Sequence, residues 1–482
     1  MPDTPEEIRS SPRKLWLAFR ATFHDRILWY LQSTLIILAL IVMASWKKST
    51  QDPNILLAES TKALESLNHP AIPASENAAV VYKKAWTSIA AWPGVPGTNP
   101  LKNNIDSDQM AADPNTETFM ANNQAVFTLL EQAGLLKDCD FGLDFRLGFN
   151  VPIPHLHSMR ELGRLLSLKA YWAAYKSNHA EAVAALQAQR DLFRHMSREK
   201  ILISSLLAES IANMVPATMQ RIMLRCPPKT ISDVRAYRKI LEQLEPREEL
   251  KTRLLETMNV EMKVGIFHMD LIAVKGLSTL GMGPPSNEPR IPVLEQAMTG
   301  NDRETIVKVY GWLNDSIKAG KTSGLDKDIL GKIREYSEGP SVLTHMLVPI
   351  IERAPQKLYF RWNRYETART GLAWLEYRLT HGHDPAMLEA LAPEILKDAP
   401  VDYQNEALHL RMDEEGLTTT RVYNSLGPSK PEGYPAVIRI YSLGFNGKDD
   451  GGQNHEMESI GTKAWEKDDI FFAILPAENT KP

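Results

Sequence analysis

The segment LHSMRELGRLLSLKAYWAAYKSNHAEAVAALQAQRDLFRHM, residues 156–196, gives the clearest indication of fold class in this chain. Its apolar and aromatic residues recur at intervals typical of one face of an amphipathic helix. The pattern breaks at Ser177, Asn178 and His179, a composition typical of turns, and then resumes. The segment therefore predicts a helical hairpin. The apolar and aromatic residues that carry this spacing are Leu162, Leu166, Tyr171 and Tyr175 before the turn and Ala182, Leu186 and Phe193 after it.

The same helical periodicity continues on both sides of the hairpin. The hairpin spacing resembles a tetratricopeptide unit, but no second copy follows at a period of about 34 residues, so no solenoid is expected. Gly and Pro are frequent over residues 276–300, which predicts a loop. We predict a mainly α fold with a large multi-helical domain over residues 50–380. Further helices are expected at 55–67, 76–92, 116–133, 201–224, 231–244, 248–271, 303–319, 343–353 and 356–379.

Composition limits the classes of protein to which the chain can belong. It has 482 residues, of which 43% are hydrophobic and 24% charged, so it is long enough for a large core and too apolar for wholesale disorder. A net charge of −4 argues against nucleic acid as a partner, since such binding needs a concentrated basic surface. Cys139 and Cys226 are the only cysteines, too few for a disulfide scaffold or a thiolate zinc cluster, although one bridge is geometrically possible.

Residues 27–46, ILWYLQSTLIILALIVMASW, form an uncharged run near the N-terminus. A helix of this length spans a bilayer core of about 30 Å. Trp29 and Tyr30 at one end and Trp46 at the other suit the two membrane interfaces. The run predicts a single transmembrane helix, so membrane lipid is an expected partner of residues 27–46.

Basic residues set the expected orientation of this helix. Five of them precede it, at Arg9, Arg13, Lys14, Arg20 and Arg26. The positive-inside bias places residues 1–26 in the cytoplasm and the bulk of the chain outside, in the periplasm of an inner-membrane protein. The alternative is a cleaved signal peptide, with Val42 and Ala44 at the cleavage site, but the apolar run exceeds a usual signal core. No cysteine follows the run, which excludes lipoprotein processing.

Composition changes after His383. Residues 384–396 predict a short helix, and the runs AVIRIYSLGF (436–445) and DIFFAIL (469–475) are typical of strands. We therefore expect a small α+β lobe over residues 384–482.

The order of motifs in this lobe resembles the C-terminal module of the major pseudopilin of type II secretion systems. The shared motifs are a Pro-led short helix, the Pro-x-Asp turn at 400–402, Tyr441-Ser442 on a strand, a Gly-Asn-Gly loop and a closing Asp-rich segment. Similar tails end many uncharacterised, membrane-tethered helical proteins of bacteria, and CDFGLDF (139–145) with PHLHSMRELGRLLSLKAYWAA (154–174) resembles that group as well. No Gly precedes Ile27 and the anchor has no Glu, so a pseudopilin-type filament subunit is not expected.

The resemblance implies a calcium site in the Gly/Asp loop YSLGFNGKDDGG, residues 441–452. Its carboxylates would come from Asp449, Asp450, Asp468 and Asp469, and its carbonyls from residues 444–447. Calcium takes 6–8 oxygen ligands, so this donor set is chemically suitable. The spacing does not fit an EF-hand, because Lys448 and Met457 would occupy ligand positions. The alternative is a solvated turn whose Asp residues cap their own backbone.

Two histidine pairs are the remaining candidates for chemistry. They are His155 with His157 and His381 with His383, the latter beside Asp384. Imidazoles with a carboxylate can hold zinc, which suggests an envelope metal-dependent hydrolase. Simpler interpretations are that His155 orients a helix start, while Gly382 ends one helix and Asp384 caps the next. Partial matches to a phosphate loop at 319–323 and to a zinc protease motif at 455–459 each lack a required residue.

These patterns lead to two functional hypotheses. The first is a single-pass cell-envelope protein with a structural or protein-interaction role, binding a second envelope protein. The alternative is the metal-dependent hydrolase using His155/His157 and His381/His383. The first involves no catalysis and no cofactor beyond calcium.

Overall fold

The structure, a computed structural model, describes residues 52–68, 70–93, 107–244, 246–275, 292–319, 353–413, 436–444 and 469–477, with short pieces at 332, 423–424, 427–428, 448–449 and 451. In these residues it contains 12 α-helices and, near the C-terminus, a small three-stranded antiparallel sheet. The predicted mainly α class with a sheet at the end of the chain is therefore confirmed. The predicted anchor, residues 27–46, lies outside the described residues.

The helices follow one another along most of the chain. They are α3 (Pro53–Glu65), α4 (Ala78–Thr87), α5 (Ser107–Ala112), α6 (Pro114–Asn122), α7 (Gln124–Leu135), α8 (His155–Tyr175), α9 (His179–Met196), α10 (Leu202–Arg225), α11 (Ile231–Glu242), α12 (Arg247–Lys275), α13 (Pro292–Lys318) and α16 (Arg353–His381), with 3-10 helices η1 (Phe145–Asn150) and η3 (Leu388–Leu391).

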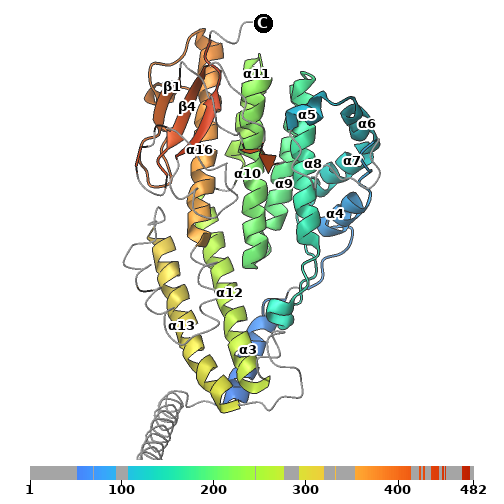
Figure 1. Cartoon of the computed structure of the whole chain (residues 1–482), viewed down its shortest axis with the longest axis vertical. Coiled ribbons are helices and arrows are strands. Elements are labelled where there is room, and N and C mark those ends of the chain that lie inside the picture. The colour runs from blue at the N-terminus through green and yellow to red at the C-terminus, as the bar shows by residue number, and fades with distance from the viewer. Residues whose placement is uncertain are drawn as a thin grey trace, which may run out of the picture.

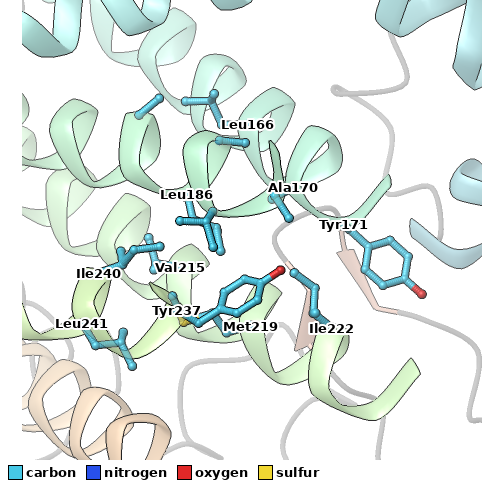
Figure 2. Packing of buried hydrophobic residues seen from close by; sticks show 14 of the residues in the cluster. Leu166, Ala170, Tyr171, Leu186, Val215, Met219, Ile222, Tyr237, Ile240 and Leu241 are labelled. Carbon is cyan, nitrogen blue, oxygen red and sulfur yellow. The ribbon is translucent and has the colours of Figure 1, made fainter. Parts of the chain in front are cut away.

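The predicted hairpin is present as α8 and α9. Ser177 between them has φ of 60°, and the Asn178 side chain accepts a hydrogen bond from the Glu181 amide to cap α9. The two helices pack on α10 and α11 to form the main hydrophobic core. Side chains of α8, α9, α10 and α11 meet there, among them Leu186, Val215 and Ile240 (Figure 2).

Helix α10 runs through the centre of this core. It is the one helix of the described chain that is long and apolar enough to cross a membrane, and 78% of its apolar window is buried inside the protein. Its neighbours are α8, α9 and α16, which cover it on several sides. Its hydrophobicity is therefore used in packing the helical body.

The helical body is elongated (Figure 1). At one end, α12 packs along α13 and against the first described helix, α3. At the other end, the sheet lies against α16, while α4 to α7 flank α8 and α9. The first described helix and the C-terminal sheet thus occupy opposite ends of the molecule.

The sheet has strand order β1-β4-β5, formed by β1 (His409–Asp413), β4 (Val437–Ser442) and β5 (Ile470–Ile474). Both pairings are antiparallel, with Ile440 opposite Leu410 on one side and Phe472 on the other. A separate two-stranded pairing joins β2 (Tyr423–Asn424) to β3 (Gly427–Pro428). Every residue of β4 and β5 is buried, and both strands contact α16, so the two predicted strand runs are confirmed. The assigned domain boundary at residue 384 remains a prediction.

The sequence misplaces several helix boundaries. Residues 384–396 form only η3, because Pro393 lacks an amide hydrogen and holds Ala392 in an extended conformation. Residues 292–300, expected in a loop, belong to α13. The helix expected over 116–133 is two helices. They are separated at Asn123, whose side chain donates to the Phe119 carbonyl and accepts from the Ala90 amide.

Two helical glycines offer a matched test of how α16 packs on the sheet. A Cβ added at Gly371 would lie 2.4 Å from Cδ1 of Phe472 on β5, whereas one at Gly311 on α13 meets nothing within 4 Å. We expect Gly371→Ala to destabilise the protein by about 1–3 kcal/mol, because overpacking exceeds the helix-propensity gain of about 1 kcal/mol. Gly311→Ala should instead stabilise by up to about 1 kcal/mol. Thermal unfolding of both variants measures the difference, and equal shifts would show that α16 does not touch β5.

Candidate functional site

The motifs of the C-terminal lobe come together where α16 meets the sheet. Asp402, the acid of the Pro-x-Asp turn, accepts a hydrogen bond from the Ser442 hydroxyl at 3.2 Å. Its other oxygen accepts from the amides of Gln404 and Glu406 at 2.8 and 2.9 Å. Asn363 of α16 completes the cluster by donating to the Ser442 hydroxyl at 2.8 Å. These are buried polar groups with matched partners, and they fasten the lobe to the helical body.

Asp449, one of the four predicted calcium ligands, lies close to the end of β4. One of its oxygens accepts from the Tyr441 hydroxyl at 3.0 Å and from the Gly451 amide at 2.8 Å. Burial and then the neighbouring Asp449 carboxylate raise the pKa of Tyr441 to about 12, so this phenol keeps its proton and acts as the donor. Asp449 therefore caps a local turn, as the alternative interpretation of the loop expects.

Asp469 is the second predicted ligand that the structure describes. It is fully buried at the start of β5, and its carboxylate accepts from the Gly444 amide at 3.2 Å. The structure thus ties the closing Asp-rich segment to the residue that follows β4. Asp450, Asp468 and residues 445–447 lie outside the described residues. Among the residues that are described, no three His, Cys, Asp or Glu side chains are grouped to hold a metal, and the calcium site remains a prediction.

Calcium addition tests the loop directly. If the site forms, millimolar calcium should raise the melting temperature of the protein, because a ligand that binds only the folded state stabilises it by mass action. Asp449→Ala should abolish this calcium-dependent rise. The control is Asp113→Ala, which removes the N-terminal cap of α6, far in sequence from the Gly/Asp loop. It should lower stability while leaving the response to calcium intact. A wild-type melting temperature insensitive to calcium would contradict the site.

The first histidine pair does not converge on one point. His155 is buried, its Nε2 lies 3.0 Å from a Glu199 oxygen, and its ring stacks on Phe141 with centroids 4.1 Å apart. His157 is exposed and pairs with Glu161 one helical turn later, at 3.1 Å. The two imidazoles therefore have separate carboxylate partners, and His155 orients the start of α8.

The second pair lies on the surface at the C-terminal end of α16. The His381 and His383 rings are 5.9 Å apart, and His381 Nε2 lies 3.3 Å from Glu394. Asp384 is already occupied, because its Oδ1 accepts from Trp374 Nε1 at 2.8 Å and from Arg378 Nε at 2.6 Å. Asp384 therefore ties down the end of α16 and does not cap a following helix as expected. Gly382, with φ of 77°, ends α16 as predicted.

Cys139 and Cys226 do not form a disulfide bond with each other. Burial, followed by the nearby Glu199 carboxylate, raises the pKa of Cys139 far above its usual value. A thiol that keeps its proton is a poor nucleophile, so the position of Cys139 near Glu199 does not make it a catalytic cysteine.

The sequence analysis did not identify the residues of α16 that lie where this helix meets the C-terminal lobe. Asn363, Thr367 and Thr370 are fully buried polar residues at helical spacing on the face of α16 that meets the rest of the protein. Asn363 also accepts from the Tyr403 amide at 2.8 Å. The sequence does contain a signal for these residues, because small polar residues recur at intervals of three and four among Trp, Tyr and Leu. Such residues on a buried helix face need hydrogen-bonding partners.

In comparisons with known proteins, the chain matches no protein family, no curated protein and no solved structure. The geometry of the described residues and the sequence pattern are therefore the basis for proposing a function.

Proposed function

We propose that the protein is a membrane-anchored cell-envelope protein that binds another envelope protein through its helical body and C-terminal lobe. The observation that carries the proposal is the elongated shape of the body. Helix α3, which begins shortly after the predicted anchor, lies at one end, and the sheet lies at the other (Figure 1). An anchor that ends at Trp46 would hold the α3, α12 and α13 end close to the bilayer. The sheet would then face away from the membrane, where a partner can reach it.

Strand β1 is the part of the lobe best suited to contact a partner. Within the described chain it pairs with β4 alone, and Met412 on it is 58% exposed. A strand with one open edge offers backbone donors and acceptors to a second chain. Beside Met412, the exposed Arg411 forms an ion pair with the largely buried Asp413 at 2.7 Å.

The orientation is tested in spheroplasts. Protease added to intact spheroplasts should degrade the chain beyond residue 50, while removal of residues 27–46 should leave the protein in the cytoplasm and protected. A body that stays intact in spheroplasts carrying the full-length chain would overturn the proposed location. Replacing Trp46 alone is the milder control and should leave the chain in the membrane, because the rest of the apolar run persists.

Partner binding is tested by photo-crosslinking in living cells. A photoreactive phenylalanine analogue at position 412 should give a specific crosslinked product in the envelope. The matched control is position 307 on α13, where Val307 is also exposed and apolar but lies on the opposite end of the body. Crosslinking at 307 and not at 412 would place the partner near the membrane and contradict a role for the lobe.

A further inference from the structure

A cavity of about 450 Å³ lies in the helical body. Its walls come from the second half of α9 and the turn after it, the connection between α11 and α12, and the first half of α12. Five cationic side chains and two carboxylates line it. The lining therefore carries more cationic than anionic side chains, although the chain as a whole carries a net charge of −4.

Three of the cations form a stripe along α9 and the turn after it. Arg190, Arg194 and Arg198 recur every four residues, an arrangement in which like charges repel each other. Asp191 is the shared partner of the first two, at 2.9 and 3.5 Å. Arg194 also donates to the Gly134 carbonyl at 2.8 Å. Arg198 pairs with Asp138 at 3.3 Å. The three guanidinium groups thus share two carboxylates, and the Gly134 carbonyl helps to hold Arg194 without cancelling charge.

The deepest charges in the lining are also positive. Arg190 and Arg253 are 19% and 12% exposed at their side chains, whereas both lining carboxylates, Glu249 and Glu256, belong to exposed residues. Behind Arg253, the buried Glu209 is shared with a second arginine, Arg361, at 3.4 Å. Two guanidinium groups thus share one buried carboxylate behind the cavity, where screening by water is weak.

Apolar groups share the cavity with these cations. Phe193, Leu244 and Pro246 line it, and both Arg253 and Arg361 lie against the Phe193 ring, at 5.7 and 4.8 Å from its centroid. The cavity volume of about 450 Å³ falls within the range of pockets that hold small organic molecules. An apolar wall beside fixed guanidinium groups suits a ligand that has both an apolar part and an anionic group.

We propose that this cavity binds a small organic oxyanion, a carboxylate or phosphate carried on an apolar or aromatic body. Arginine presents paired N–H donors that match the oxygens of carboxylates and phosphates, which is why it is preferred at such sites. Arg190 and Arg253 contact the anionic group, and Phe193 and Leu244 contact the body of the ligand. The proposal does not depend on the membrane anchor or on a protein partner.

Isothermal titration of the purified full-length protein in detergent tests this assignment, with phenyl phosphate and benzoate as the two anionic probes. At least one probe should bind at one site per chain. Benzyl alcohol, which lacks the charge, should bind at least tenfold more weakly. Raising the salt concentration should weaken anion binding, because exposed cations contribute to it. The stronger of the two anions identifies phosphate or carboxylate as the preferred group.

Two cavity variants and one control keep the test independent of folding. Arg190→Gln should weaken binding about tenfold or more, since a hydrogen bond to a charged group contributes about 1.5–3 kcal/mol. Lys200→Gln changes an exposed residue at the rim and should weaken binding only severalfold. Lys83→Gln, on the exposed face of α4, should change nothing. The proposal is overturned if neither anion binds saturably at millimolar concentration, or if the folded Arg190→Gln and Lys83→Gln variants bind alike.

Discussion

Replacement of Glu209 by Gln is expected to lower the free energy of unfolding by about 3–5 kcal/mol, the largest effect of any single substitution considered for this chain. Glu209 lies on α10 and is buried, with Arg253 of α12 hydrogen-bonded to one of its oxygens and Arg361 of α16 3.4 Å from the other. Gln keeps the shape of the side chain but removes the charge. The buried Arg361 and the half-buried Arg253 would then lose their shared carboxylate, and removing one partner of a buried ion pair is costly.

Thermal unfolding of the full-length protein in detergent measures this loss. The matched control is Glu117→Gln, which removes an exposed carboxylate 3.4 Å from Lys176 and should cost less than about 1 kcal/mol. A second variant separates charge from packing. Arg361→Met in the Glu209→Gln background should recover part of the stability, because it removes one uncompensated charge while filling similar space. No recovery would mean that shape, and not charge, explains the effect of Glu209→Gln.

Much of the helical body follows from local sequence pattern. The hairpin of α8 and α9 was predictable because its apolar spacing and its turn at Ser177 and Asn178 are local features. Strands β4 and β5 were predictable from their short apolar runs for the same reason. The errors at Asn123 and at residues 384–396 arose where a side chain bonds a distant group or a proline intervenes, which periodicity does not register.

The candidate sites were harder to predict because their residues come from separate elements. The Gly/Asp loop directed attention to Asp449 and Asp469, and the structure gives both a role in holding backbone amides. The cavity was missed, although Arg190, Arg194 and Arg198 stand at regular spacing in the sequence. A run of basic residues on a helix normally indicates a solvated face. In the folded protein α12 lies beside this face of α9 and places Arg253 next to Phe193, so the face lines a cavity.

Replacement of Asn363 by Ala should have the second largest effect, about 2–5 kcal/mol, and should act at the junction between α16 and the C-terminal lobe. The fully buried Asn363 side chain donates to Ser442 of β4 and accepts from the Tyr403 amide, both at 2.8 Å. Alanine would leave the buried Tyr403 amide without its acceptor, which costs about 1–3 kcal/mol, and would also remove a hydrogen bond from Ser442, which still donates to Asp402. The lobe should loosen before the helical body unfolds, because these bonds join the two.

Limited proteolysis and thermal unfolding together measure this effect, with Asn259→Ala as the matched control. Asn259 also lies within a helix and bonds another side chain, Asn314, at 3.1 Å, but it is exposed. Both substitutions gain the same helix propensity, so their difference isolates the buried hydrogen bonds. We expect faster cleavage between β1 and β4 in Asn363→Ala and wild-type cleavage in Asn259→Ala. If both variants resist protease equally, then the bonds of Asn363 do not hold the lobe, and the buried apolar contacts of β4 and β5 with α16 are sufficient to fix it in place.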